Sequence, residues 1–219
     1  MLLLMNYNHA IQFIQSKLNA HKAKRLKIPN FIPAAVIIPF FNKNREAHIL
    51  FTVRTNTVEH HKGQVSFPGG AQEKQDTTLL ETALRETYEE VGIPPDAITY
   101  LGQLDDFPTI TNFLVTPFVG KIPYPYPCNI NTDEVAEVIE VPLDLFLTDR
   151  DFELKEKAYQ GKKYPVFYYH FQHTVIWGVT AFIINRFIEF IFDYNPAPKS
   201  ILEDPRQQQY LADNIYNRK

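Results

Sequence analysis

Apolar residues recur along the chain with two different periods. Short runs rich in β-branched and aromatic residues, bounded by polar turns, predict strands, and apolar residues spaced three and four positions apart predict amphipathic helices. The expected strands are 34–41, 48–54, 98–104, 113–119, 134–141, 152–158 and 164–171. The expected helices are 8–18, 76–91 and 175–192, with a helical turn at 142–147 and loops at 55–70 and 121–131. The first two strands and the last two are close enough in sequence to form hairpins.

The central expected helix, 76–91, carries signals at both ends. Thr78 with Glu81 three residues later has the form of a capping box, which satisfies free backbone N–H groups at a helix start. Gly92 follows the last periodic residue, as is usual where a helix ends in a left-handed residue. Strands interrupted by this helix and closed by a late one predict an α/β layered domain, with helices on both faces of a mixed sheet.

Length and composition favour one large domain. The chain has 219 residues, of which 45% are hydrophobic, enough for a sizeable core. We expect the main domain at 33–195, an N-terminal helix and basic linker at 1–32 that pack on it, and a C-terminal tail at 196–219.

Charge and cysteine content exclude several classes of protein. The 22 Lys and Arg against 25 Asp and Glu leave a formal net charge of −3, which argues against a large nucleic-acid interface. The single cysteine, Cys128, cannot form an internal disulfide and indicates a reducing compartment.

The opening MLLLM is too short for a signal peptide, and no run of 18 apolar residues predicts a membrane span. We expect a cytoplasmic protein, and the sequence leaves open whether it forms a homodimer.

Three glutamates on the central helix are the main candidates for chemistry. Glu86, Glu89 and Glu90 are spaced i, i+3 and i+4, so a helix projects their carboxylates from one face. Such like charges repel one another unless a cation lies among them, and carboxylate oxygens are the ligands that Mg²⁺ prefers. A solvated helix face is the alternative. Arg85, which can brace a neighbouring carboxylate, favours a site.

Two glycines one loop upstream of these glutamates add to the pattern. Gly69 and Gly70 present bare backbone that can approach a phosphate group or the helix closely. Together, GGAQEKQDTTLLETALRETYEEVGI resembles the Nudix box, in which Gly, five residues, Glu and seven residues precede Arg-Glu-apolar-x-Glu-Glu-x-Gly-apolar. The sequence departs from that pattern in three ways: Asp76 replaces the first glutamate, eight residues separate it from Arg85, and Thr87 takes the apolar position.

A second motif resembles one branch of this family, the coenzyme A pyrophosphatases. LFTVRTNTVEHHKGQVSFPGG, from Leu50 to Gly70, reproduces the branch's signature in its spacing. It differs at Phe51, Thr55 and Glu59, and at Glu59 an anion replaces the expected arginine. The segments VPLDLF and IWGVTA, later in the chain, are also similar to this branch.

The resemblance implies a Nudix-type α/β/α sandwich and a Mg²⁺- or Mn²⁺-dependent pyrophosphohydrolase. Its expected reaction splits coenzyme A or an acyl derivative into 4′-phosphopantetheine and adenosine 3′,5′-bisphosphate. Glu86 and Glu90 match the family's metal ligands, and Glu89 is either a further ligand or the general base. The alternative base is Glu134 or Glu137. The competing interpretation of these two residues is that they are ordinary side chains at an exposed strand edge.

Substrate contacts are expected from the loop upstream of the helix. Arg54 is a candidate phosphate clamp, or alternatively a strand-end salt bridge, and His60, His61 or Lys62 could replace the missing cation. Gly69 and Gly70 complete the expected substrate-binding set.

The sequence contains further candidate residues and is compatible with two other functions. Aromatic candidates for a pocket are Phe113, Tyr124 and Tyr126, whereas packing is the favoured role of Trp177 and no role is expected for His170 or His173. The other functions are hydrolysis of another nucleotide, such as ADP-ribose or a dinucleotide, and a non-catalytic nucleotide sensor. The sensor is disfavoured because the glutamate cluster is intact.

Overall fold

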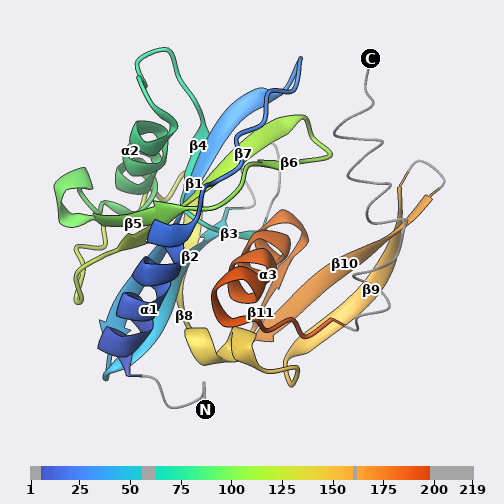
Figure 1. Cartoon of the computed structure of the whole chain (residues 1–219). Helices are drawn as coiled ribbons and strands as arrows, with labels where there is room; N and C mark the ends of the chain where they lie inside the picture. Colours follow the sequence, from blue (N-terminus) through green and yellow to red (C-terminus); the bar gives the residue numbers. More distant parts are fainter. Residues whose placement is uncertain (1–5, 56–62, 160–161, 198–219) are drawn as a thin grey trace.

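The main structural unit is a mixed eight-stranded sheet with helices on both faces (Figure 1). The computed structural model describes residues 6–55, 63–159 and 162–197, without the side chains of 159 and 162–164. The sheet contains β1 (Ile32–Lys43), β2 (Glu46–Arg54), β3 (Val65–Ser66), β4 (Gly69–Ala71), β5 (Thr99–Gln103), β6 (Phe107–Pro108), β7 (Phe113–Lys121) and β8 (Val135–Pro142). Among the described strand pairs of this sheet, β1 and β7 are parallel and the others antiparallel.

Three helices and a second sheet complete the fold. The helices are α1 (Tyr7–Ala20), α2 (Leu79–Val91) and α3 (Gly178–Phe192), and the short 3₁₀ helices are η2 (Pro95–Ala97) and η3 (Leu143–Leu147). A three-stranded antiparallel sheet contains β9 (Phe152–Tyr159), β10 (Lys162–Phe171) and β11 (Thr174–Trp177). Among the described residues, no helix is long and apolar enough to cross a membrane.

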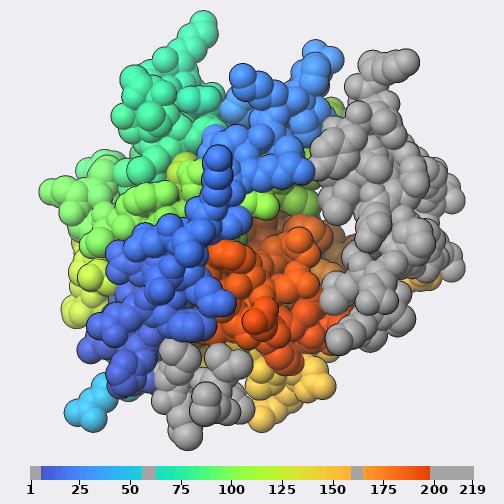
Figure 2. Space-filling view, viewed as in Figure 1, coloured from blue at the N-terminus to red at the C-terminus, as the bar shows by residue number. Residues whose placement is uncertain are grey.

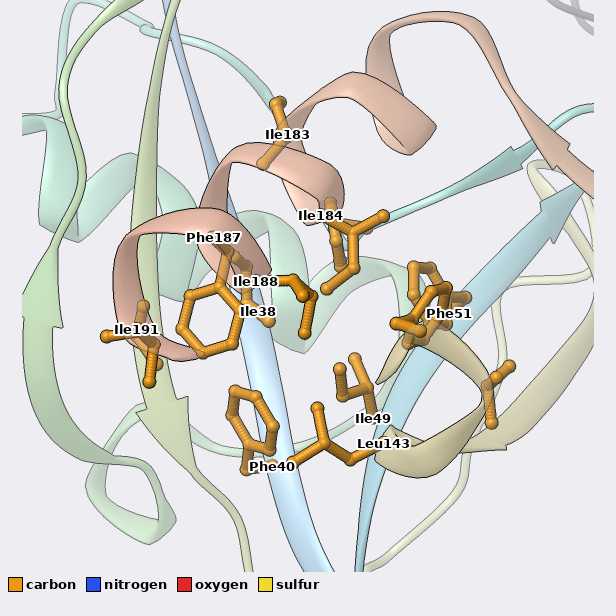
Figure 3. Packing of buried hydrophobic residues seen from close by; sticks show 14 of the residues in the cluster. Ile38, Phe40, Ile49, Phe51, Leu143, Ile183, Ile184, Phe187, Ile188 and Ile191 are labelled. Carbon is orange, nitrogen blue, oxygen red and sulfur yellow. The ribbon is translucent and has the colours of Figure 1, made fainter. Parts of the chain in front are cut away.

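Alternation along β1 divides the core into two layers, because successive strand residues point to opposite faces. Ala35 and Ile37 pack with Ala83 of α2 on one face. Ile38 and Phe40 point to the other face and join the large cluster under α1 and α3 (Figure 3). Fully burying one such side chain contributes about 1.5–3 kcal/mol. The predicted α/β architecture, a mixed sheet between helices, is confirmed.

Helices α1 and α3 lie side by side on the face of the molecule shown in Figure 2. Ile14 and Leu18 of α1 belong to the same buried cluster as Phe187 and Ile191 of α3. The N-terminal helix is thus packed on the sheet domain, as its apolar spacing predicts.

Helix α2 has the ends that the sequence predicts, except that it begins three residues later. Thr78 caps it, with the Thr78 hydroxyl accepting from Glu81 N and the Glu81 carboxylate accepting from Thr78 N. Asp76 lies outside the helix because its carboxylate accepts a hydrogen bond from Glu73 N and closes a turn. The helix ends at Gly92, whose φ of 78° is left-handed.

The prediction of one helix over 175–192 is wrong in its first residues. Thr174–Trp177 form strand β11, which pairs with β10 from Phe171↔Thr174 to Tyr168↔Trp177. Gly178 follows with a φ of 68°, which turns the chain from strand into α3. The β-branched and aromatic residues before it satisfy their backbone groups in the ladder instead of in a helix.

The hairpins β1–β2 and β9–β10 are confirmed. Strands β3, β4 and β6 were not predicted, because each has only two or three residues and exists through its pairing with a longer strand. Strand β4 pairs with β1 at Ala35↔Gly70 and Val36↔Gly69, and this pairing places the glycines beside Glu86 of α2.

Candidate active site

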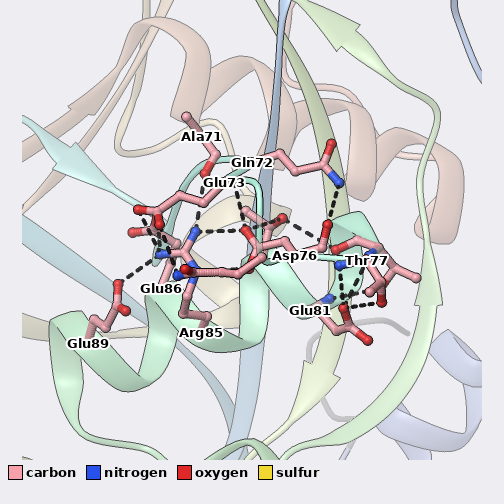
Figure 4. Close-up of polar contacts among 12 residues, drawn as sticks. Ala71, Gln72, Glu73, Asp76, Thr77, Glu81, Arg85, Glu86 and Glu89 are labelled. Atoms are coloured by element: carbon pink, nitrogen blue, oxygen red, sulfur yellow. Dashed lines mark hydrogen bonds and ion pairs between the residues drawn. The ribbon is translucent and has the colours of Figure 1, made fainter.

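Arg85 is the centre of a polar network at the start of α2 (Figure 4). Its Nε donates to Asp76 Oδ1 at 3.0 Å and its Nη2 donates to Asp76 Oδ2 at 2.9 Å, a two-pronged ion pair. Nη2 also donates to the carbonyl of Ala71 at 3.2 Å. The guanidinium is therefore fixed between the loop and the helix.

The remaining nitrogen of Arg85 holds two of the three helix glutamates. Nη1 donates to Glu86 Oε1 and to Glu89 Oε2, both at 2.9 Å. Arg85 thus contacts both carboxylates at once.

Asp76 occupies a defined position in spite of the altered spacing of its motif. Besides Arg85, its Oδ2 accepts from Thr82 Oγ1 at 3.0 Å and from Glu73 N at 2.9 Å. The Arg85 hydrogen bonds hold the pKa of Asp76 well below its usual range, although burial acts in the opposite direction. Asp76 also closes a turn with Glu73, since Asp76 N donates to the carbonyl of Glu73 at 3.1 Å.

Glu90 is the most buried carboxylate of the group, with a side chain only 2% exposed. Its Oε2 has no hydrogen-bond partner among the described residues. Burial, followed by the charge of Glu86, raises the pKa of Glu90 to about 8, although Arg54 and the backbone N–H of Gly69 lower it. A buried acceptor without a partner is costly, so this oxygen calls for a cation or a donor.

Glu86 lies between Glu90 and the glycine loop. Burial raises its pKa, while Arg85 acts in the opposite direction. A Cβ atom added to Gly70 would lie 2.4 Å from Glu86 Oε1, so only glycine allows this close approach. Gly69 has a φ of 152°, and a Cβ there would lie 2.2 Å from the carbonyl oxygen of Ala35.

The two alternative bases have different surroundings. Glu134 precedes β8 and is close enough to raise the pKa values of both Glu86 and Glu90. Glu137 lies inside β8, where its carboxylate contacts His173 Nε2 at 3.0 Å. Its neighbour Val138 points to the α2 side, so alternation turns Glu137 away from α2. Of the two, only Glu134 lies beside the helix glutamates.

Arg54 joins the site from the end of β2. Val53 and Arg54 pair with Glu137 and Val135 of β8, so Ala136 is an extra residue and forms a bulge in β8 opposite Arg54. Its Nη1 lies 3.8 Å from Glu90 Oε1, and its buried Nε has no hydrogen-bond partner among the described residues. The next segment, with Glu59, His60, His61 and Lys62, lies outside the described residues, so their expected contacts stay predictions.

The sequence did not single out Asn131, which connects two parts of the site. Its backbone N–H donates to the carbonyl of Glu90 at 3.0 Å, and its own carbonyl accepts from Glu134 N at 3.1 Å. Asn131 Oδ1 also accepts from Asp133 N, an Asx turn. The Asn-Thr-Asp sequence is a turn signal that could have indicated this role.

Most other residues considered from the sequence lie outside this group. Tyr126 donates to Glu140 Oε1 at 2.7 Å, and Lys43 donates to Glu140 Oε2 at 2.6 Å. Tyr124 stacks on Phe41 with ring centroids 5.1 Å apart. Phe113 packs against the large hydrophobic cluster, and Trp177 stacks on Tyr168. His170 forms a polar contact with Glu153.

The carboxylate oxygens at and beside Glu90 are suitable ligands for a hard divalent cation. Three carboxylates, from Glu86, Glu90 and Glu134, influence one another, and one buried oxygen is unpartnered. Among the described residues, no group of three or more His, Cys, Asp or Glu side chains is already arranged to hold a metal ion. Arg85 and Arg54 lie against these carboxylates instead.

Comparison with known proteins gives a family and several relatives. Residues 31–161 match the model of the NUDIX domain. The chain is 39% identical over 153 residues to the uncharacterized Nudix hydrolase NudL of Photorhabdus laumondii, covering 70% of this chain and 81% of the relative. It is 41% identical over 153 residues to the NudL protein of Cronobacter sakazakii, covering 70% of this chain and 79% of the relative.

Solved structures give a looser likeness. A MutT/nudix family protein from Enterococcus faecalis aligns with a TM-score of 0.48 and 13% identity, over 91% of this chain and 81% of that one. The NUDIX domain of Shewanella oneidensis NrtR, complexed with ADP ribose, aligns with a TM-score of 0.41 and 20% identity, over 57% of this chain and 77% of that one.

Proposed function

The chain belongs to the Nudix domain family, whose hydrolases act on pyrophosphate bonds, and from this premise we propose that it hydrolyses the diphosphate of coenzyme A or acyl-coenzyme A. The products would be 4′-phosphopantetheine and adenosine 3′,5′-bisphosphate. The observation that carries the proposal is the buried, unpartnered carboxylate oxygen of Glu90, set among Glu86, Glu134 and the Gly69–Gly70 loop. Its neighbours offer oxygen ligands and leave room for bare backbone to approach a phosphate group.

Nudix hydrolases generally use a divalent metal such as Mg²⁺, and we propose Glu86 and Glu90 as its ligands, with Mn²⁺ as a substitute. When bound there, the ion would neutralise phosphate charge and polarise the phosphoryl oxygens. Arg85 would keep the backbone of the loop and the carboxylates of the helix in a fixed relation, because it bonds to Asp76, Ala71 and Glu86 together.

Two carboxylates are candidates for accepting the proton of the attacking water. Glu89 is half exposed, and one of its oxygens is already bound by Arg85. Glu134 faces Glu86 and Glu90 from another loop. We favour Glu134 as the base, and Glu89 as a further metal ligand, because a base on a separate segment can face the phosphorus without competing for Arg85.

The choice of coenzyme A rests on the motif from Leu50 to Gly70. Its ends border the site, since Arg54 lies beside Glu90 and Gly70 lies beside Glu86. Arg54, His61 and Lys62 would supply cations to the substrate's phosphates. All these residues fall in 33–195, the segment that we propose as the hydrolase domain, between the N-terminal segment 1–32 and the tail 196–219.

The test is a panel of nucleotide diphosphate derivatives assayed with Mg²⁺, with products resolved by mass. Coenzyme A should be split into the two products named above, with higher kcat/KM than ADP-ribose or a dinucleotide. Faster hydrolysis of ADP-ribose would show that the coenzyme A proposal is wrong, and would leave the family assignment intact.

A further inference from the structure

The two guanidinium groups beside the helix carboxylates are held in very different ways. Arg85 is only 16% exposed, and the described residues contact all three of its nitrogens through Asp76, Ala71, Glu86 and Glu89. Each of these hydrogen bonds is 2.9–3.2 Å long. Arg85 therefore has little freedom to leave its place.

Arg54 is loosely held by comparison. Its closest ion-pair contact among the described residues, Nη1 to Glu90 Oε1, is 3.8 Å, which is too long for a hydrogen bond. Its Nε is unpartnered among the described residues, and 27% of its side chain is exposed. A donor with unused capacity next to solvent can turn toward an incoming anion without breaking a strong contact.

The position of Arg54 next to Glu90 affects any cation that binds to Glu90. Glu90 is almost fully buried, and among the described residues Arg54 is the cation that lies against its carboxylate. A divalent cation at Glu90 would experience repulsion from a guanidinium left at this distance. The arginine and the cation are therefore alternative partners of one carboxylate.

We propose that Arg54 is an exchangeable counter-charge, which pairs with the Glu90 carboxylate when that carboxylate is ionised in the free protein, yields it to the divalent cation, and turns to the substrate's diphosphate. The proposal rests on the proposed function, because it takes Glu90 as a metal ligand. Its consequence is coupling: cation and diphosphate each favour the displacement of Arg54 from Glu90, so each should strengthen binding of the other.

Whether substitution of Arg54 strengthens or weakens Mn²⁺ binding distinguishes this exchange role from a purely structural one. If Arg54 competes with the cation, a neutral residue there should tighten Mn²⁺ binding by at least about fivefold, the effect that a unit charge some 4 Å away has even in a water-like dielectric. If Arg54 merely supports Glu90, the same change should weaken Mn²⁺ binding. The expected coupling in the wild type lies in the common range of about 5- to 150-fold.

The experiment titrates Mn²⁺ into the metal-free full chain, with free Mn²⁺ followed by electron paramagnetic resonance, with and without ADP as the diphosphate probe. Arg54→Gln removes the charge, Arg54→Met keeps the apolar stem if the Gln variant does not fold, and Arg54→Lys keeps a charge. Arg186→Gln is the matched control, because it removes an exposed arginine of α3 that is paired with Glu189.

The neutral variants should bind Mn²⁺ at least about fivefold more tightly without ADP and lose most of the ADP enhancement, while Arg54→Lys and Arg186→Gln stay close to wild type. Unchanged or weaker Mn²⁺ binding in a folded neutral variant overturns the exchange role alone, provided that the wild type binds Mn²⁺. A wild type that binds no Mn²⁺ overturns both this inference and the proposed metal site.

Discussion

Asp76→Asn offers a direct measure of how far the network around Arg85 stabilises the site. The substitution keeps the shape of the side chain and removes its charge. Asp76 is only 4% exposed and accepts four hydrogen bonds, from Arg85 Nε and Nη2, Thr82 Oγ1 and Glu73 N. Three of these go to Oδ2 and one to Oδ1, so an asparagine that keeps its oxygen at the Oδ2 position still turns an amide donor toward Arg85 Nε.

The magnitude follows from that geometry. One charge-assisted hydrogen bond is lost, at about 1.5–3 kcal/mol, and the remaining bond to Arg85 becomes a weaker one to a neutral oxygen. Arg85 keeps Glu86 and Glu89, so its charge is not left uncompensated and the full cost of breaking a buried pair does not apply. We expect the free energy of unfolding to fall by about 2–3 kcal/mol.

The pH dependence has a definite sign. The pKa of Asp76 is lowered in the folded state, so its contribution is fully present above the unfolded value of 3.8 and is lost only as pH falls toward the folded value. The difference between wild type and Asp76→Asn should therefore stay constant from about pH 8 to pH 5.

Urea denaturation of the metal-free proteins at pH 7 measures the difference, and Asp105→Asn is the control. Asp105 is 54% exposed, and its contacts with His21 and Lys24 N lie at the surface. Its loss should cost at most about 1 kcal/mol. An Asp76→Asn effect no larger than that of the control would refute the reasoning that the network is strong and buried.

Four further outcomes are expected. Glu90→Gln should lower kcat on the order of 10²- to 10³-fold with an unchanged circular dichroism spectrum; wild-type turnover would exclude Glu90 as a ligand. In Mg²⁺ titrations Glu134→Gln should lower the rate with metal affinity kept, and Glu89→Gln should weaken metal binding; the reverse result would exchange their roles. Coenzyme A should exceed 3′-dephospho-coenzyme A in kcat/KM by roughly tenfold, because the 3′-phosphate adds a charge-assisted hydrogen bond; equal kcat/KM values would contradict such a contact. Gly70→Ala should leave the melting temperature nearly unchanged but weaken Mg²⁺ binding, because the new Cβ would displace the end of Glu86; equal Mg²⁺ affinity would count against Glu86.

Local features of this protein follow directly from its sequence. The ends of α2 are set by Thr78, Glu81 and Gly92, whose effects act within a few residues of chain. The i, i+3 and i+4 spacing of the glutamates likewise needs only a helix to place the carboxylates close together. The same holds for the β1–β2 and β9–β10 hairpins, because short polar turns join strands that are neighbours in sequence.

The tertiary structure determines which strands, helices and side chains these local elements contact. Residues 174–177 form a strand because β10 offers a ladder to pair with, and apolar periodicity alone could not distinguish that from a helix. Glu137 points away from α2 because of its place in β8, and the direction of a strand side chain depends on strand register. The contact between Arg54 and Glu90 joins the end of β2 to α2 across 36 positions of sequence. Such long-range contacts depend on how layers pack and where a bulge falls, which no short stretch of sequence determines.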